Sequence, residues 1–293
     1  MVLAGEAPPI YQPPVLRTGA RRDLETRAIT FTISGLKRRG VRFRLAIQTL
    51  ARTGIIVIRG AAPPQTVKTL AQMADETWDT IAALPKGEVL QDVILNRDQD
   101  RMLRGYKALV ESHKPVINLR HGDDEGMMDI FHPENLAAEH HHLVLECLHE
   151  DLVGELARKA FGRTLEVKCR NLYVNRGVNK TRLYHCDGEK AKVKSFVYLN
   201  DVSSFGIGPY CYIKKSHRDR RLRERNQAFN AQHNLNKHEY RLLGGRAALP
   251  IFCQAGDMVV SAQHGAHRGH PQTPSARRAV LLNVYEPTIG SKD

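Results

Sequence analysis

Residues 165–175, with the sequence LEVKCRNLYVN, open the part of the chain that decides the fold. Further short runs rich in β-branched and aromatic residues follow, separated by turn residues, at 195–200, 210–213, 258–261 and 279–285. Many short strands joined by turns are typical of an antiparallel barrel or a jelly roll. The C-terminal half of the chain is therefore predicted to consist mainly of strands.

The sequence before residue 165 has a different pattern. Residues 54–60, GIIVIRG, form a β-branched run bounded by glycines, which predicts one buried strand. Pro63 and Pro64 then open a helix, because proline is tolerated in the first helical turn. A second amphipathic helix is predicted over residues 134–161. Helices followed by many short strands indicate an α+β fold.

The composition is that of one soluble domain. The chain has 293 residues, of which 42% are hydrophobic, so it can bury one substantial core. We predict that residues 1–45, which are rich in proline and arginine, form an N-terminal arm or an irregular first layer over the core, and that residues 46–293 form a single domain. No apolar run approaches ~18 residues and the first residues do not resemble a signal peptide, so we expect a cytoplasmic protein without a membrane segment. The five cysteines are far apart and predict neither a disulfide framework nor a zinc knuckle.

Two features of the C-terminal half can bring metal ligands together. In residues 184–188, YHCDG, His185 and Asp187 are two residues apart and point to the same side of an extended chain. An HxD motif alone is weak evidence. A Gly256-Asp257 turn and a strand follow later, and then three histidines and two arginines, which are His264, His267, His270, Arg277 and Arg278.

These residue types suit one kind of metal centre. Two histidines and one carboxylate on one face of an iron(II) ion leave three positions open, for a bidentate 2-oxo acid and for oxygen. The planar donors of an arginine can bind the far carboxylate of that acid through two parallel hydrogen bonds.

The order of these motifs resembles that of the phytanoyl-CoA dioxygenase-like family of iron(II)/2-oxoglutarate-dependent oxygenases. The resemblance extends from about residue 54 to residue 285, and beyond the HxD motif it is carried by Gly208-Pro209, Ser216-His217, Gly256-Asp257, His267 and Arg278. It implies a double-stranded β-helix core, of the jelly-roll or cupin-like form, with flanking N-terminal helices. It also implies that iron(II) is held by His185, Asp187 and His267.

The resemblance also assigns the pocket for 2-oxoglutarate. It places Arg278 on the 5-carboxylate, with Arg277 as the competing candidate, because neighbouring strand residues face opposite ways. Asn171 and Tyr173 share one face of the strand before HxD and are candidates for lining this pocket, as is Phe196. The sequence departs from the family at Lys214-Lys215, where Pro-Gly is usual, and in the short segment after Asp187, which holds three lysines.

The implied reaction is oxidative decarboxylation of 2-oxoglutarate to succinate and CO2, with O2 as the other co-substrate, coupled to hydroxylation of a C–H bond. Because Asp187 occupies the position that a halide would need, hydroxylation is favoured over halogenation. Desaturation, epimerisation or ring formation would need the same residues. The net charge of +13 attracts anions, whether phosphates on a small substrate, acidic groups on a carrier or nucleic acid, and does not choose among them. With the resemblance, we expect a small, anionic substrate.

Other patterns have simpler explanations that compete with a functional one. Residues 214–246 hold 10 Lys or Arg against 3 Asp or Glu, which predicts either a solvated face or a basic, lid-like insertion. The basic balance also leaves a nucleic-acid-binding or nucleic-acid-modifying protein as the alternative function, although the 6% aromatic content and the lack of a known motif oppose it.

Residues 140–142 are three histidines that diverge around a helix. Residues 127–131 suit either a loop over the site or the core.

Overall fold

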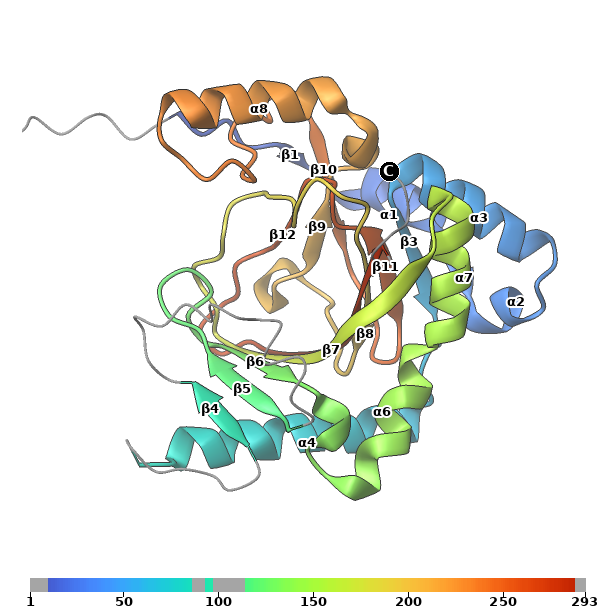
Figure 1. The fold of residues 1–293 in the computed structure, drawn as a ribbon, viewed down its shortest axis with the longest axis vertical. Helices are drawn as coiled ribbons and strands as arrows, with labels where there is room; N and C mark the ends of the chain where they lie inside the picture. Colours follow the sequence, from blue (N-terminus) through green and yellow to red (C-terminus); the bar gives the residue numbers. More distant parts are fainter. Residues whose placement is uncertain (1–9, 86–92, 97–113, 288–293) are drawn as a thin grey trace, which may run out of the picture.

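Two sheets face each other in the computed structural model, which describes residues 10–85, 93–96 and 114–287 (Figure 1). The larger sheet has, in spatial order, β2 (Thr30–Thr32), β3 (Ile55–Arg59), β11 (Met258–Ala262), β8 (Val193–Tyr198), β13 (Arg277–Pro287), β7 (Leu165–Arg176), β6 (Met127–Phe131), β5 (Val116–Leu119) and β4 (Ile94–Asn96). The smaller sheet has β1 (Val15–Leu16), β10 (Ala247–Ile251), β9 (Tyr210–Tyr212) and β12 (His267–Gly269). The predicted strand-rich C-terminal half is confirmed.

Helices cover the outer face of the larger sheet (Figure 1). Residues from this sheet, such as Leu172, Val197 and Leu281, form one buried cluster with Leu50 and Leu70 of the helices. The helices that contribute to this cluster are α2 (Ile33–Lys37), α3 (Val41–Thr53), α4 (Pro64–Ala83), α6 (His141–Leu148) and α7 (Glu150–Phe161). As predicted, α4 begins at a proline. None of the helices in the described parts of the chain is long and apolar enough to cross a membrane.

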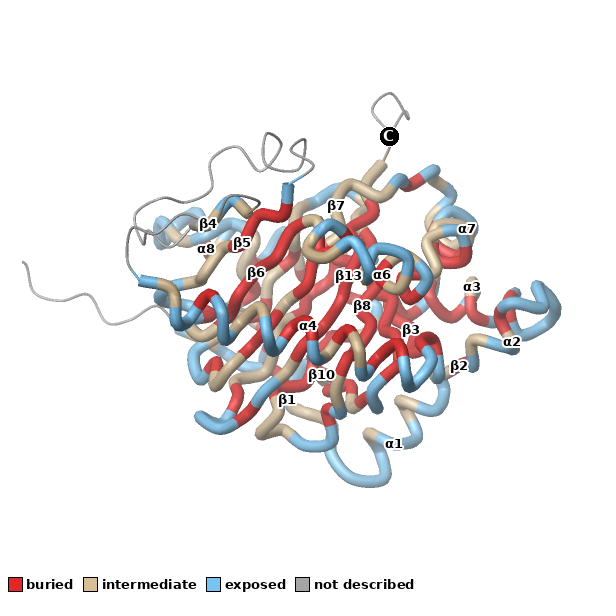
Figure 2. The backbone as a smooth tube through the Cα atoms, turned by 90° about the horizontal axis from the view of Figure 1, so that it is seen from below, coloured by how far each residue is buried: buried red, intermediate tan, exposed pale blue. Residues whose placement is uncertain are grey.

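A second core lies between the two sheets. Val280 and Leu282 of β13 belong to it together with Tyr212 of β9 and Leu249 of β10, whereas Leu281 belongs to the helix-side cluster. This alternation follows from the period of two along a strand. Every second residue of β7, β8 and β13 therefore faces the space between the sheets, and Figure 2 shows buried residues along the middle of the sheet.

The helix predicted over residues 134–161 is wrong as a single element. The segment contains two short 3₁₀ turns, η1 (Pro133–Asn135) and η2 (Ala138–His140), and then α6 and α7. The break between α6 and α7 falls at His149, whose φ is 45° and whose ring nitrogen lies 2.6 Å from the carbonyl oxygen of Ala61. Because both helices pack against the same sheet, the apolar periodicity continues through the break and conceals it.

Residues 10–45, which lie within the predicted N-terminal arm, contain α1 (Gly19–Arg27), β2, α2 and the start of α3. Strand β2 pairs in parallel with β3, and Phe31, Leu36 and Phe43 are buried in the helix-side core. This part of the chain therefore packs as part of the main body. Its short elements carry too few residues each for a periodic pattern to be visible in the sequence.

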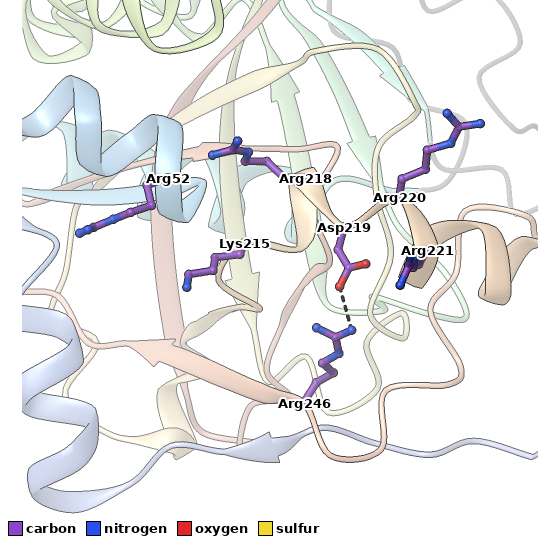
Figure 3. Close-up of a pocket in the computed structure, with 7 residues that line it drawn as sticks. All are labelled: Arg52, Lys215, Arg218, Asp219, Arg220, Arg221 and Arg246. Carbon is purple, nitrogen blue, oxygen red and sulfur yellow. Dashed lines mark ion pairs between the residues drawn. The ribbon is translucent and has the colours of Figure 1, made fainter.

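The basic segment 214–246 lies beyond β9. It contains a 3₁₀ turn, η4 (Ser216–Arg218), and α8 (Arg220–Gln232), which begins where Asp219 accepts a hydrogen bond from the backbone N–H of Leu222. Several arginines gather at this end of α8 (Figure 3). In Figure 1, α8 lies at the end of the smaller sheet, on the side away from α4 and α6.

Candidate metal centre

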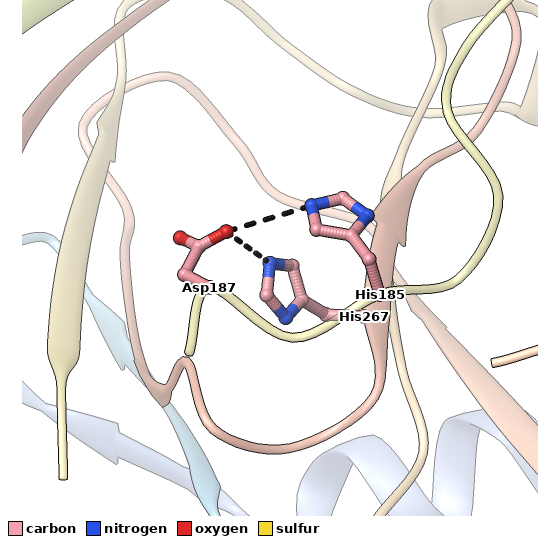
Figure 4. Close-up of side chains that lie close together, drawn as sticks. All are labelled: His185, Asp187 and His267. Carbon is pink, nitrogen blue, oxygen red and sulfur yellow. Dashed lines mark ion pairs between the residues drawn. The ribbon is translucent and has the colours of Figure 1, made fainter. Parts of the chain in front are cut away.

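His185, Asp187 and His267 come together between the two sheets (Figure 4). His185 and Asp187 lie between β7 and β8, and His267 is the first residue of β12. The backbone N–H of His185 donates to the carbonyl oxygen of His267 and the reverse bond also forms, both at 3.0 Å. One potential ligand atom from each of the three side chains lies within 4.8 Å of the others. Donor atoms this close together can bind one metal ion.

The backbone fixes which nitrogen of each imidazole faces the centre. The Nδ1 atom of His185 lies 2.8 Å from the carbonyl oxygen of Leu183, and Nδ1 of His267 lies 2.9 Å from that of Gly265. A carbonyl oxygen accepts only, so each Nδ1 carries the proton and each Nε2 keeps a free lone pair. Both Nε2 atoms face Oδ1 of Asp187, at 3.6 and 3.7 Å. Such backbone bonds orient metal-binding histidines.

The protonation states also suit a metal ion. Burial, together with the neighbouring imidazole of His267, holds the pKa of His185 well below its usual value, and burial lowers the pKa of His267 to about 4. Burial alone would raise the pKa of Asp187, but Lys194 and the two histidines hold it well below its usual value. Neutral imidazoles and an ionised carboxylate are the forms that bind metals.

Lys194 is part of this centre and was not predicted as a site residue. Its ammonium nitrogen lies 2.6 Å from Oδ2 of Asp187, the oxygen that faces away from the histidines. Lys194 and Phe196 lie on the same face of β8, so the alternation along this strand could have indicated it. The sequence showed only that lysine occurs at every second position here, at Lys190, Lys192 and Lys194.

The predicted cofactor-pocket residues share the same interior face. Arg278, Val280 and Leu282 of β13 lie opposite Asn175, Tyr173 and Asn171 of β7, and Phe196 of β8 lies opposite Leu282. Arg277 is exposed on the other face. The structure thus brings Arg278, Asn171, Tyr173 and Phe196 to one side of the sheet, between the two sheets.

Several buried polar atoms in this space have no hydrogen-bond partner among the described residues. They include Oδ1 of Asn171, Oδ1 of Asn175 and Nε of Arg278. Nη1 of Arg278 donates to the carbonyl oxygen of Gly208, and burial lowers the pKa of this arginine. Unpaired buried polar groups are costly, so they point to a polar ligand. The carboxylates of a dicarboxylate such as 2-oxoglutarate accept hydrogen bonds, so they fit the free Nε donor of Arg278, whereas the two amide oxygens need a donor such as water.

A buried ion pair extends the polar surface along β6. Asp129 is fully buried opposite Tyr173, its Oδ2 lies 2.5 Å from Nη2 of Arg120, and its Oδ1 accepts from the amide of Asn171 at 3.4 Å. Burial, with the charge of Asp129, raises the pKa of Tyr173 well above its usual value. Residues 127–131 are therefore a central strand, and the alternative of a loop over the site is wrong.

The remaining histidines do not join the centre. Among the described residues, no other group of three or more His, Cys, Asp or Glu is close enough to hold a metal, which excludes residues 140–142. The ring of His264 packs at 5.6 Å from that of His217, and Nδ1 of His270 contacts the carbonyl oxygen of Pro271.

The basic segment is attached to the HxD motif through the backbone. The N–H of Cys186 donates to His238 at 3.0 Å, and the N–H of Tyr240 donates to Tyr184 at 2.7 Å. The amide of Gln227 in α8 also donates to Glu189 at 3.1 Å. The segment predicted as a lid-like insertion is therefore hydrogen-bonded directly to the residues around His185 and Asp187.

Comparison with known proteins identifies the fold. No protein-family model and no curated protein sequence matches the chain. Among solved structures, it is similar to the non-haem α-ketoglutarate-dependent carbocyclase SnoK from nogalamycin biosynthesis, with a TM-score of 0.54, 15% identity and 83% of each chain covered. It is also similar to AviO1 from Streptomyces viridochromogenes, with a TM-score of 0.53, 14% identity and coverage of 83% of this chain and 94% of that one.

A third similar structure is the epimerase SnoN in complex with Fe3+, α-ketoglutarate and nogalamycin RO. Its TM-score is 0.52 at 12% identity, and the match covers 87% of this chain and 84% of that one. At such identities the likeness concerns the fold. The chain has the double-stranded β-helix fold of these proteins, as the sequence predicted.

Proposed function

We propose that this protein is an iron(II)/2-oxoglutarate-dependent dioxygenase that hydroxylates a C–H bond of a small, anionic molecule. The convergence of His185, Asp187 and His267, each with its donor atom directed at the others, is the observation that carries the proposal. The order of the sequence motifs supports a place near the phytanoyl-CoA dioxygenase-like group.

The three ligands would hold the metal with two neutral nitrogens and one negative oxygen. Bound iron(II), with 2-oxoglutarate and dioxygen, supplies decarboxylation of the 2-oxo acid to succinate and CO2 coupled to oxidation of a C–H bond. Lys194 keeps Oδ2 of Asp187 engaged at 2.6 Å, which leaves Oδ1 for the metal. The hydrogen bonds from Nδ1 of both histidines prevent rotation of their rings.

Arg278 is the proposed anchor for the distal carboxylate of 2-oxoglutarate. It faces the interior beside Asn175, it has an unpaired Nε, and it remains charged because an arginine holds its proton at all working pH values. The unpaired carboxamide oxygens of Asn171 and Asn175 lie on the same face and can accept from ordered water around the bound acid. The rings of Phe196 and Tyr210, 5.1 Å apart, limit water beside it.

Hydroxylation is proposed because Asp187 supplies the carboxylate ligand that a halide would have to replace. The similar solved structures include a carbocyclase and an epimerase, which carry out other reactions. The mass of the product distinguishes these reactions from hydroxylation. A hydroxylated product gains one oxygen atom. A cyclised or desaturated product loses two hydrogen atoms, and an epimerised product keeps its mass.

The test is anaerobic reconstitution with iron(II), followed by titration with 2-oxoglutarate. We expect one metal per chain, a charge-transfer absorption band when 2-oxoglutarate is added, and slow succinate formation after air is admitted. A protein that binds iron(II) without any spectral response to 2-oxoglutarate would contradict the proposal. Mass spectrometry of small anionic candidates incubated with the active enzyme then tests the reaction type.

A further inference from the structure

A strongly basic hollow lies on the outside of the molecule, at the start of α8 (Figure 3). Its volume is about 600 Å³. Cations from separate parts of the chain line it: one from the last turn of α3, four from residues 215–221, which include η4 and the beginning of α8, and one from the turn before β10. They are Arg52, Lys215, Arg218, Arg220, Arg221 and Arg246. The metal-centre residues do not line this hollow.

Most of this positive charge is uncompensated. Arg246 lies 2.8 Å from Asp219, the one acidic residue that lines the hollow, and Arg220 lies 2.6 Å from Glu224. Within the described parts of the chain, the other four cations make no ion pair with an acidic side chain. All four are exposed. Bringing like charges together from three segments costs electrostatic free energy, which a bound anion would recover.

The composition of the hollow favours phosphate groups. Arginine donors bind phosphate oxygens through paired hydrogen bonds, and five of the six cations are arginines. A hollow of about 600 Å³ has the size of a small-molecule site and exceeds the needs of one phosphate. Four unpaired cations match the charge of two linked phosphates.

The same composition argues against a nucleic acid as the ligand. No aromatic side chain lines the hollow, whereas proteins that bind single strands stack bases on aromatic rings.

We propose that this hollow is a binding site for a diphosphate group, either free or carried by a larger small molecule. The site does not depend on the proposed metal chemistry, because none of its residues belongs to the metal centre. The fold connects it to that centre through one hydrogen bond. Ser216, between two of the lining residues, accepts from the N–H of Ala266 at 2.8 Å, and Ala266 directly precedes His267. A diphosphate bound here would thus sit on the segment that supports a metal ligand.

The test is calorimetric titration of metal-free protein with inorganic pyrophosphate at low ionic strength. We expect one saturable site and at least about tenfold weaker binding of inorganic phosphate, since fewer charge-assisted hydrogen bonds form. Arg218→Gln should weaken pyrophosphate binding about threefold or more, and Arg218→Gln combined with Arg221→Gln about tenfold or more. Adenosine diphosphate, titrated in parallel, distinguishes a free diphosphate from one carried by a nucleoside.

Arg44→Gln is the matched control. Arg44 is an exposed arginine of α3, the helix that supplies Arg52, and it does not line the hollow. We expect its pyrophosphate affinity to equal that of the parent protein. Arg52→Gln provides a second test on another element, and thermal unfolding checks that each variant folds.

Three outcomes would overturn the proposal. One is the absence of saturable pyrophosphate binding at millimolar concentration. Another is an equal loss of affinity in Arg44→Gln, which would mean that only net charge matters. The third is tighter binding of a single-stranded oligonucleotide than of pyrophosphate, with the same loss in the arginine variants, which would assign the surface to nucleic acid.

Discussion

The metal centre and the basic hollow are both built from charged side chains, but the two sites differ in how far these charges are exposed and paired. At the metal centre the charges are paired and mostly shielded from solvent, with Asp187 held between Lys194 and two imidazoles. In the hollow most of the cations are exposed and lack an acidic partner in the described structure. Water screens exposed charges strongly and buried ones weakly. Single substitutions should therefore have large effects at the centre and small effects at the hollow.

The largest effect is expected for Asp187→Ala. It removes the anionic ligand and leaves Lys194 without its partner, so metal affinity should fall by more than about 100-fold, beyond the loss seen for groups that only support a ligand. Titration with nickel(II), followed by hydroxylation assays, measures this. Glu189→Ala, which deletes an exposed carboxylate two residues away, should retain metal binding. Equal affinity in Asp187→Ala and the parent protein would show that the triad is wrongly assigned.

Arg278→Lys should have the next largest effect. Lysine keeps the charge but loses the paired donors, so the affinity for 2-oxoglutarate should fall about tenfold or more while iron(II) binding stays nearly the same. The matched control is Arg277→Lys, since Arg277 is exposed on the opposite face of β13. Both are measured through the charge-transfer band. A loss confined to Arg277→Lys would move the anchor by one residue.

Lys194→Met tests how the neighbouring cation sets the charge of Asp187. Lys194 lowers the pKa of this carboxyl, so its removal should raise that pKa. Because only the ionised carboxylate binds metal, the variant should lose metal at a higher pH than the parent protein does. Nickel(II) titrations from acid to neutral pH measure the midpoint. Lys192→Met, which removes a partner of Glu286, should leave that midpoint in place.

The smallest effect is expected at the hollow itself. Arg246→Gln breaks the ion pair with Asp219, whose side chains are 46% and 25% exposed. Solvent screening limits such a pair to about 0–1 kcal/mol, so the free energy of unfolding should change little. Urea denaturation measures it. A loss of several kcal/mol would mean that charge in the hollow is structural, and the contrast between the two regions would disappear.

The sequence predicted the parts of the molecule that depend on short-range patterns. Strands β7, β8, β9, β11 and β13 follow from β-branched runs and turns, whereas β10 and β12 were not predicted. His185 and Asp187 are close in one short motif. The choice of Arg278 over Arg277 depends on the alternation along β13, and the register with β7 places Arg278 on the interior face. The roles of these residues remain predictions.

The sequence did not predict contacts that depend on pairing between distant strands. Lys194 reaches Asp187 only because the HxD segment folds back over β8, and Arg120 meets Asp129 across the β5–β6 hairpin. The break at His149 depends on its contact with Ala61, 88 residues away. No local pattern contains this information. In the sequence, the basic hollow was visible only as a charged segment, because Arg52 and Arg246 are brought to it by the folding of distant parts of the chain.

The backbone hydrogen bonds between residues 184–186 and 238–240 have a consequence for local unfolding. They join Cys186 to His238 and Tyr240 to Tyr184, so the basic segment cannot separate from the HxD motif unless both bonds break. Amides that open in one cooperative event exchange their hydrogens with solvent at a common rate. Cys186 and Tyr240 should therefore show the same protection in hydrogen exchange, and a ligand that protects one of these amides should protect the other.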